Sequence, residues 1–290
     1  MDMDFKSFTD DIERNGWNVF GTEVYKDGVL AGSFGDTAGL HEMYSATKTV
    51  LSVAIGIARD EGLIDLDRSI LDYIPEEYSS DLPSDRTEAW RKITIKRLLT
   101  MSVPSLPFRH EGENWLKYAL SCDIGDGEKR EFNYSNVSAY LAGVALTHAV
   151  GTDAGKFIED RIFRPLDISE YEYGRSPEGY FYGASQMKLS VHDLSRIGLL
   201  LYNGGTYEGR QIVSRSYVDE ASSVQQMNRE GGYGYFIWKY RDGFSINGKW
   251  KQKCYVLPSR GIVVTYLSDI RDDSHDLLKS MEKNILGINE

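Results

Sequence analysis

Strand-like segments at both ends of the chain, with helical segments between them, constrain the fold of these 290 residues most strongly. Aliphatic and polar residues alternate on both sides of Asp27-Gly28 within residues 18–36, which predicts a hairpin. Strand-like runs and a terminal helix follow near the other end, at residues 235–240, 244–257, 261–269 and 275–286. We therefore expect an α/β (α+β) protein with an antiparallel sheet, flanked by helices and built from both ends of the chain.

The middle of the chain has helical patterns. Apolar residues recur every three or four positions in residues 47–61, and Ser190 with Asp193 predicts a capped helix that ends near residue 203. Between these, residues 63–190 have the pattern of shorter helices broken by polar loops. We expect one domain with two lobes: an α/β lobe from about residues 1–62 and 191–290, and a helical lobe from about residues 63–190.

Composition excludes several classes of partner. A formal net charge of −11 disfavours binding to nucleic acid or to an anionic lipid surface. No apolar run is long enough to span a bilayer, and the acidic first residues lack the pattern of a secretory signal, so we expect a cytoplasmic protein without a membrane partner. In that reducing compartment, Cys122 and Cys254 are expected to be free thiols. The sequence assigns no oligomeric state.

Ser45 and Lys48 form an S-x-x-K motif at the start of the helix predicted for residues 47–61. Residues three positions apart lie on the same side of a helix, so the lysine can reach the serine. A lysine acts as a base only where burial or a cationic field lowers its pKa. On this motif alone, a helix start with a capping serine and a solvated lysine is the more frequent explanation.

Tyr134 and Asn136 begin another helical segment and are a second pair of candidates. A phenol can relay a proton, and an amide can hold a substrate carbonyl group. The alternative is that Tyr134 is one of 19 tyrosines and that Asn136 caps the helix.

With its S-x-x-K at Ser45–Lys48 and its Y-x-N at Tyr134–Asn136, the sequence resembles the penicillin-binding protein and class C β-lactamase superfamily of serine hydrolases. That superfamily includes esterases and 6-aminohexanoate-dimer hydrolases. The flanking segments at residues 45–75, 93–101 and 182–214 are similar as well, so the resemblance covers nearly the whole chain. It implies a β-lactamase/transpeptidase-like fold with the active site between two lobes. It also implies catalysis by Ser45 as nucleophile, Lys48 as base and Tyr134 as proton relay, with Asn136 positioning the substrate or Lys48.

The third motif of the superfamily matches less well. Its best fit is Ile246-Asn247-Gly248, where a basic residue that helps to hold the substrate carboxylate in penicillin-recognising members is missing. The resemblance implies that Gly248 lets the substrate approach and that the backbone N–H groups of Ser45 and Lys249 form an oxyanion hole. Lys249 or Lys251 could supply the missing charge, and strand alternation would point both to one face.

These features predict a serine hydrolase that acts through an acyl-serine intermediate on a small ester, amide or lactam. The missing basic residue favours an esterase or amidase over a true β-lactamase. Two alternatives remain: a β-lactamase or D,D-peptidase, and a sensor-like module that binds penicillin-type ligands without turnover. A small-molecule substrate is the expected partner, and neither a metal ion nor an organic cofactor is expected.

Overall fold

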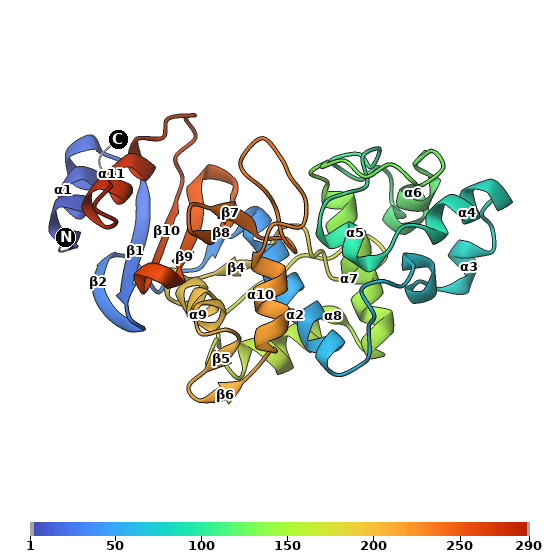
Figure 1. Cartoon of the computed structure of the whole chain (residues 1–290), viewed down its shortest axis with the longest axis horizontal. Helices are drawn as coiled ribbons and strands as arrows, with labels where there is room; N and C mark the ends of the chain where they lie inside the picture. The colour runs from blue at the N-terminus through green and yellow to red at the C-terminus, as the bar shows by residue number, and fades with distance from the viewer. Residues whose placement is uncertain (1–2, 289–290) are drawn as a thin grey trace.

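The computed structural model describes residues 3–288 and centres on a six-stranded antiparallel sheet in the order β2-β1-β10-β9-β8-β7 (Figure 1). Strands from both ends of the chain lie side by side in it, as expected. Its strands are β1 (Val19–Lys26), β2 (Val29–Gly35), β7 (Trp238–Tyr240), β8 (Gly243–Gly248), β9 (Gln252–Leu257) and β10 (Ile262–Ser268). The antiparallel pairing of β1 with β2 confirms the hairpin around Asp27-Gly28.

The single run expected at residues 244–257 is in fact two strands, so that expectation was wrong. A short 3₁₀ turn, η4 (Lys249–Lys251), separates β8 from β9, and Trp250 and Lys251 adopt positive φ angles of 58° and 66°. The sequence did not indicate this turn, because Lys-Trp-Lys contains none of the residues that favour such a turn. Lys249 and Lys251 consequently do not alternate along a strand, and the two side chains have different surroundings.

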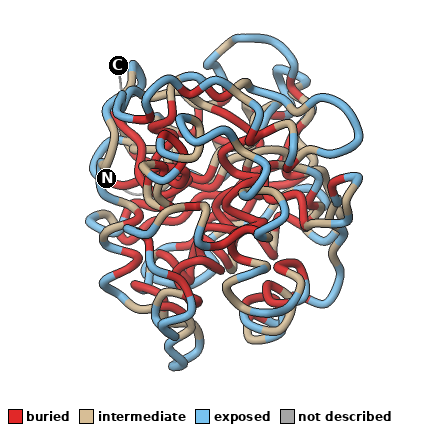
Figure 2. The backbone as a smooth tube through the Cα atoms, turned by 90° about the vertical axis from the view of Figure 1, so that its right-hand side faces the viewer, coloured by how far each residue is buried: buried red, intermediate tan, exposed pale blue. Residues whose placement is uncertain are grey.

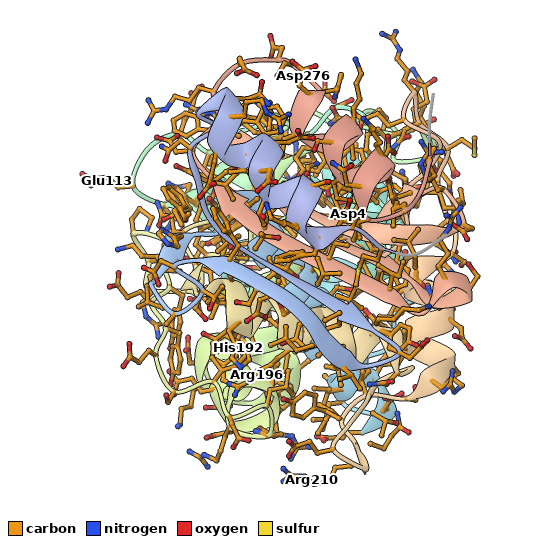
Figure 3. The ribbon with its side chains drawn as sticks, turned by 90° about the vertical axis from the view of Figure 1, so that its left-hand side faces the viewer. Asp4, Glu113, His192, Arg196, Arg210 and Asp276 are labelled. Carbon is orange, nitrogen blue, oxygen red and sulfur yellow. The ribbon has the colours of Figure 1, made fainter. Side chains whose placement is uncertain are left out.

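Helices cover both faces of the sheet. α1 (Phe5–Asn15) and α11 (Asp276–Asn284) lie side by side over one face, and the Asp4 N–H donates to the Asn284 carbonyl at 2.8 Å (Figure 3). α9 (Val191–Tyr202) packs on the other face against β1, β9 and β10, and it begins with the predicted capping box of Ser190 and Asp193. Because both faces are covered, every residue of β10 is buried.

The middle of the chain forms helices around α7 (Asn136–Val150), which is buried over most of its length. Buried segments run through the interior of the molecule and exposed ones lie around its rim (Figure 2). These elements are η2 (Ile70–Tyr73), α3 (Glu76–Ser79), α4 (Ser84–Arg91), α5 (Ile95–Leu99), α6 (Trp115–Ser121), α7 (Asn136–Val150), α8 (Ala154–Ile158) and η3 (Glu159–Phe163). The shorter helices expected here are confirmed, whereas the boundaries of the two lobes stay a prediction. Among residues 3–288, no helix is long and apolar enough to cross a membrane.

The remaining elements join the sheet to the helices. They are β3 (His41–Glu42), η1 (Tyr44–Ala46), α2 (Thr47–Asp60), β4 (Lys188–Leu189), β5 (Thr206–Tyr207), β6 (Arg210–Gln211), α10 (Arg215–Ser222) and η5 (Pro258–Arg260). α2 contacts α7, α8 and α10, while η1 at its start contacts β8. The start of α2 therefore lies where the sheet meets the helices.

Candidate active site

Ser45 lies in η1, directly before α2, on a strained backbone. Tyr44 has a φ of 47°, a left-handed conformation that is a clear outlier for a bulky side chain. The Met43 N–H donates to the Met187 carbonyl at 2.7 Å and fixes the segment before the turn. Strain of this kind persists only where the surrounding structure holds it, and it is common at functional sites.

Lys48 is fully buried, and its Nζ atom has three hydrogen-bond partners. It lies 3.0 Å from Ser45 Oγ, 2.8 Å from Asn136 Oδ1 and 2.8 Å from the Ala184 carbonyl. Burial alone lowers the pKa of Lys48 to about 7, because no carboxylate of residues 3–288 is close enough to stabilise the charged form. The alternative of a solvated lysine is therefore wrong for this chain.

Tyr134 and Asn136 are brought to the same place by the start of α7. The Tyr134 hydroxyl interacts with Ser45, its ring centroid lies 4.9 Å from Lys48 Nζ, and burial raises its pKa. Ser135 caps the helix, since its Oγ accepts from the N–H groups of Val137 and Ser138. The Asn136 side chain is thus free to hold Lys48 and is not the helix cap.

The third motif has its last two residues at the pocket and its first residue in the core. Asn247 and Gly248 line the same pocket as Ser45, whereas Ile246 is fully buried in the hydrophobic core. A Cβ atom on Gly248 would collide with the Met43 carbonyl oxygen, just before the turn that carries Ser45. The glycine is therefore needed for packing of β8 against that turn, a reason that the sequence did not show.

The nearby lysines divide into two groups. Lys249 lines the Ser45 pocket, with its ammonium 4.4 Å from the Trp250 ring centroid. Lys251 lies outside that pocket and is held by Asp272 at 2.9 Å and by the Ser274 carbonyl at 2.7 Å. Lys253, which sequence reasoning missed, lines the pocket from β9 opposite Asn247, and burial lowers its pKa to about 8. Its position follows from the β8–β9 register, which becomes visible only once the turn at 249–251 is placed.

The Ser45 pocket has a volume of about 470 Å³ and combines the candidate residues with aromatic and basic side chains. Its walls are Tyr44, Ser45, Phe108, Arg109, Tyr134, Asn136, Ser185, Glu230, Trp238, Asn247, Gly248, Lys249 and Lys253. Phe108 and Trp238 flank the Tyr134 ring at centroid distances of 6.3 and 5.5 Å. Among its lining residues, three are basic and one is acidic.

The family model for beta-lactamase matches residues 24–281, most of the chain. This chain belongs to the beta-lactamase family. Within that family, it is 23% identical over 229 residues to the 6-aminohexanoate-dimer hydrolase of Paenarthrobacter ureafaciens. That match covers 73% of this chain but only 58% of the relative, so the chain spans less than two thirds of that protein.

Solved structures show the same beta-lactamase fold. A D-stereospecific amidohydrolase from Streptomyces sp. superposes with a TM-score of 0.72 at 17% identity, covering 99% of this chain and 100% of that one. A penicillin-binding protein homologue from Caulobacter crescentus superposes with a TM-score of 0.75 at 14% identity, covering 97% and 96%. These likenesses confirm the expected fold, and the family match confirms the resemblance noted in the sequence.

Proposed function

We propose that this chain is a serine hydrolase that cleaves a small amide or ester through an acyl-serine intermediate at Ser45. The observation that carries the proposal is the Lys48 amine, which is fully buried with its Nζ atom 3.0 Å from Ser45 Oγ. The relatives support it, since one is named a 6-aminohexanoate-dimer hydrolase and another a D-stereospecific amidohydrolase.

The hydrogen bonds of Lys48 fit the neutral form of a base. A neutral amine has two N–H donors and one lone pair. Asn136 Oδ1 and the Ala184 carbonyl can only accept, so they take the two N–H groups. The lone pair then faces Ser45, whose hydroxyl can donate to it.

In the proposed first step, Lys48 Nζ takes the Ser45 proton as Oγ bonds to the substrate carbonyl carbon. The backbone N–H groups of Ser45 and Lys249 stabilise the resulting oxyanion. The leaving nitrogen or oxygen receives its proton from the Tyr134 hydroxyl, which is reprotonated from Lys48, and the bond to the carbonyl carbon breaks. The product is an ester of Ser45.

In the second step, water attacks the acyl-serine and loses its proton to Lys48 by way of Tyr134. Lys48 gives this proton to Ser45 Oγ as the bond from Oγ to the acyl carbon breaks, and the carboxylic acid is released. The partly buried Tyr134 hydroxyl suits this relay because its raised pKa keeps it protonated when no proton is in transit. The buried Ile246 in place of a basic residue favours amides and esters over penicillins.

The test is multiple-turnover hydrolysis of a linear 6-aminohexanoate dimer, p-nitrophenyl acetate and a penicillin, by wild type and by Ser45→Ala. The proposal predicts many product molecules per chain for the amide or the ester and none for Ser45→Ala. Turnover of the penicillin alone would assign a β-lactamase instead. A single stoichiometric release without further turnover would assign a sensor, and activity retained by Ser45→Ala would remove Ser45 as the nucleophile.

A further inference from the structure

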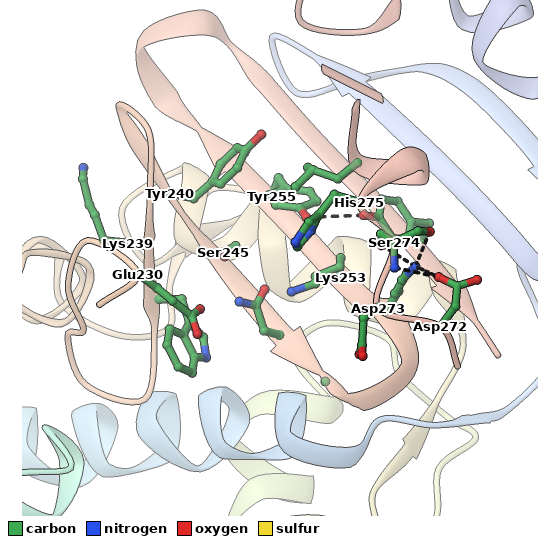
Figure 4. Close-up of a pocket in the computed structure, with 16 residues that line it drawn as sticks. Glu230, Lys239, Tyr240, Ser245, Lys253, Tyr255, Asp272, Asp273, Ser274 and His275 are labelled. Atoms are coloured by element: carbon green, nitrogen blue, oxygen red, sulfur yellow. Dashed lines mark hydrogen bonds and ion pairs between the residues drawn. The ribbon is translucent and has the colours of Figure 1, made fainter. Parts of the chain in front are cut away.

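A second pocket adjoins the Ser45 pocket and has no role in the proposed reaction steps. This outer pocket has a volume of about 390 Å³, and Glu230, Asn247, Gly248 and Lys253 are among the residues that line both pockets. It extends across β7, β8 and β9 to His275 before α11 (Figure 4). A substrate with its carbonyl at Ser45 could therefore extend past Lys253 into the outer pocket.

Two polar groups on the wall between the pockets lack partners. Asn247 and Lys253 are opposite each other in the β8–β9 register, so their side chains share one face of the sheet. Within residues 3–288, the Lys253 ammonium has no hydrogen bond or ion pair, and the buried Asn247 Oδ1 atom has no hydrogen-bond partner. The Lys253 side chain is partly buried, whereas the Asn247 Oδ1 atom is fully buried. A buried polar atom without a partner costs free energy, and a bound ligand can remove that cost.

Existing ion pairs determine which charged side chains of the outer pocket are available to a ligand. Lys251 and Asp272 neutralise each other at 2.9 Å. The Glu230 carboxylate has no ion pair among the described residues, and it lies close enough to Lys253 and Tyr134 to affect their pKa values. Lys239 and Asp273 also line the pocket and form no ion pair among the described residues. The pocket thus presents available charges of both signs beside the Asn247 amide oxygen, a set that matches a ligand with both charges.

We propose that the outer pocket binds one end of the substrate and that this end is zwitterionic, as in an α-amino acid joined through its side-chain carbonyl. Lys253 receives its carboxylate, while Glu230 and Asn247 Oδ1 receive its ammonium. This inference rests on the proposed function because it places the scissile carbonyl at Ser45. It adds a substrate class that the family match does not supply.

The test measures binding of four anilides to Ser45→Ala by isothermal titration calorimetry, since this variant binds without hydrolysis. The γ-glutamyl group carries both charges, and the glutaryl group carries the carboxylate alone. The 4-aminobutyryl group carries the ammonium alone, and the butyryl group carries neither. We expect γ-glutamyl anilide to bind at least about tenfold more tightly than each of the other three, as charged hydrogen bonds in a partly desolvated site allow.

Two variants in the same background identify the groups. Lys253→Met should weaken γ-glutamyl and glutaryl anilide about tenfold and spare the other two, because only the carboxylate loses its partner. Glu230→Gln should weaken γ-glutamyl and 4-aminobutyryl anilide instead. The control is Lys279→Met, which removes an exposed lysine of α11. Thermal unfolding checks that each variant is folded.

Equal affinity of the four anilides would overturn the inference, and so would equal binding of glutaryl and γ-glutamyl anilide. Both results are measured on Ser45→Ala, in which the outer-pocket residues are unchanged, so they do not require Lys253→Met to fold. Neither depends on Ser45 chemistry. Hydrolysis of p-nitrophenyl acetate by wild type tests the proposed function separately, and the two failures can be told apart.

Discussion

The Nζ atom of Lys48 lies 3.0 Å from the Oγ atom of Ser45, and the lysine side chain has no exposed surface. This contact joins the proposed nucleophile to the proposed base, whose pKa of about 7 allows the neutral form at physiological pH. We expect Lys48→Met to slow acylation by p-nitrophenyl acetate about 10²- to 10⁴-fold, the usual contribution of a general base. Stopped-flow release of p-nitrophenol measures this rate.

Lys279→Met is the matched control, since Lys279 is an exposed lysine on α11. It should leave the acylation rate unchanged. An unaltered rate in Lys48→Met, with the protein still folded by circular dichroism, would show that another group takes the serine proton.

The acylation rate should fall tenfold for each pH unit below about 7, because the protonated Lys48 amine has no lone pair to accept the serine proton. Above that pH, the rate should level off. The pH profile of the p-nitrophenol burst is the measurement. A rate that stays flat from pH 5 to pH 9 would contradict a lysine base.

Asn136→Asp should move this acid limb to higher pH. The new carboxylate would lie at the position of Oδ1, 2.8 Å from Lys48 Nζ, and a close negative charge stabilises the protonated amine. We expect a shift of about 1–3 pH units in the midpoint of the burst-rate profile. A profile that coincides with that of wild type would mean that Asn136 does not contact the base in solution.

Burial of Lys48 also predicts how stability depends on pH. Its pKa falls from 10.5 to about 7 on folding, so between these values the unfolded chain binds one more proton than the native chain. The free energy of unfolding should therefore rise with pH by roughly 1.4 kcal/mol per unit between pH 7 and pH 9, relative to Lys48→Met. Urea unfolding of both proteins measures the difference. Parallel pH curves would show that Lys48 is not buried in the native state.

Gly248→Ala should reduce both stability and acylation. The added methyl group meets the Met43 carbonyl oxygen, and relief of such overlap costs about 1–3 kcal/mol and displaces the turn that carries Ser45. Thermal unfolding and the burst rate are the two readouts.

Gly209→Ala is the comparison variant, because Gly209 has a φ of 78° in the turn between β5 and β6, where open space surrounds the Cβ position. It should lower stability alone. Loss of stability without loss of activity in Gly248→Ala would mean that β8 does not fix the position of Ser45.

The sequence predicted much of the fold because its patterns are local. The Asp27-Gly28 hairpin, the helix after Ser45 and the Ser190 capping box each depend on residues within a short segment, and each is present in the structure. The turn at Lys249–Lys251 was missed, since strand pairing imposes positive φ angles on residues that do not favour them.

The site was predicted less completely because long-range contacts determine it. The S-x-x-K and Y-x-N motifs identified four residues that the structure brings together. The Ala184 carbonyl, which completes the environment of Lys48, and Lys253, which faces the pocket from the next strand, have no motif. Whether Lys48 is buried depends on the packing of α2 against α7, which no local pattern shows.

The central claim is that Ser45 forms an acyl intermediate, and intact-protein mass spectrometry after acid quench tests it most directly. Wild type and Ser45→Ala are each mixed with p-nitrophenyl acetate and quenched during the burst. The account predicts that wild type gains the mass of one acetyl group, which peptide mapping places on Ser45, and that Ser45→Ala gains none. An unmodified wild-type protein that still releases p-nitrophenol over many turnovers, or an equal adduct on Ser45→Ala, would contradict it.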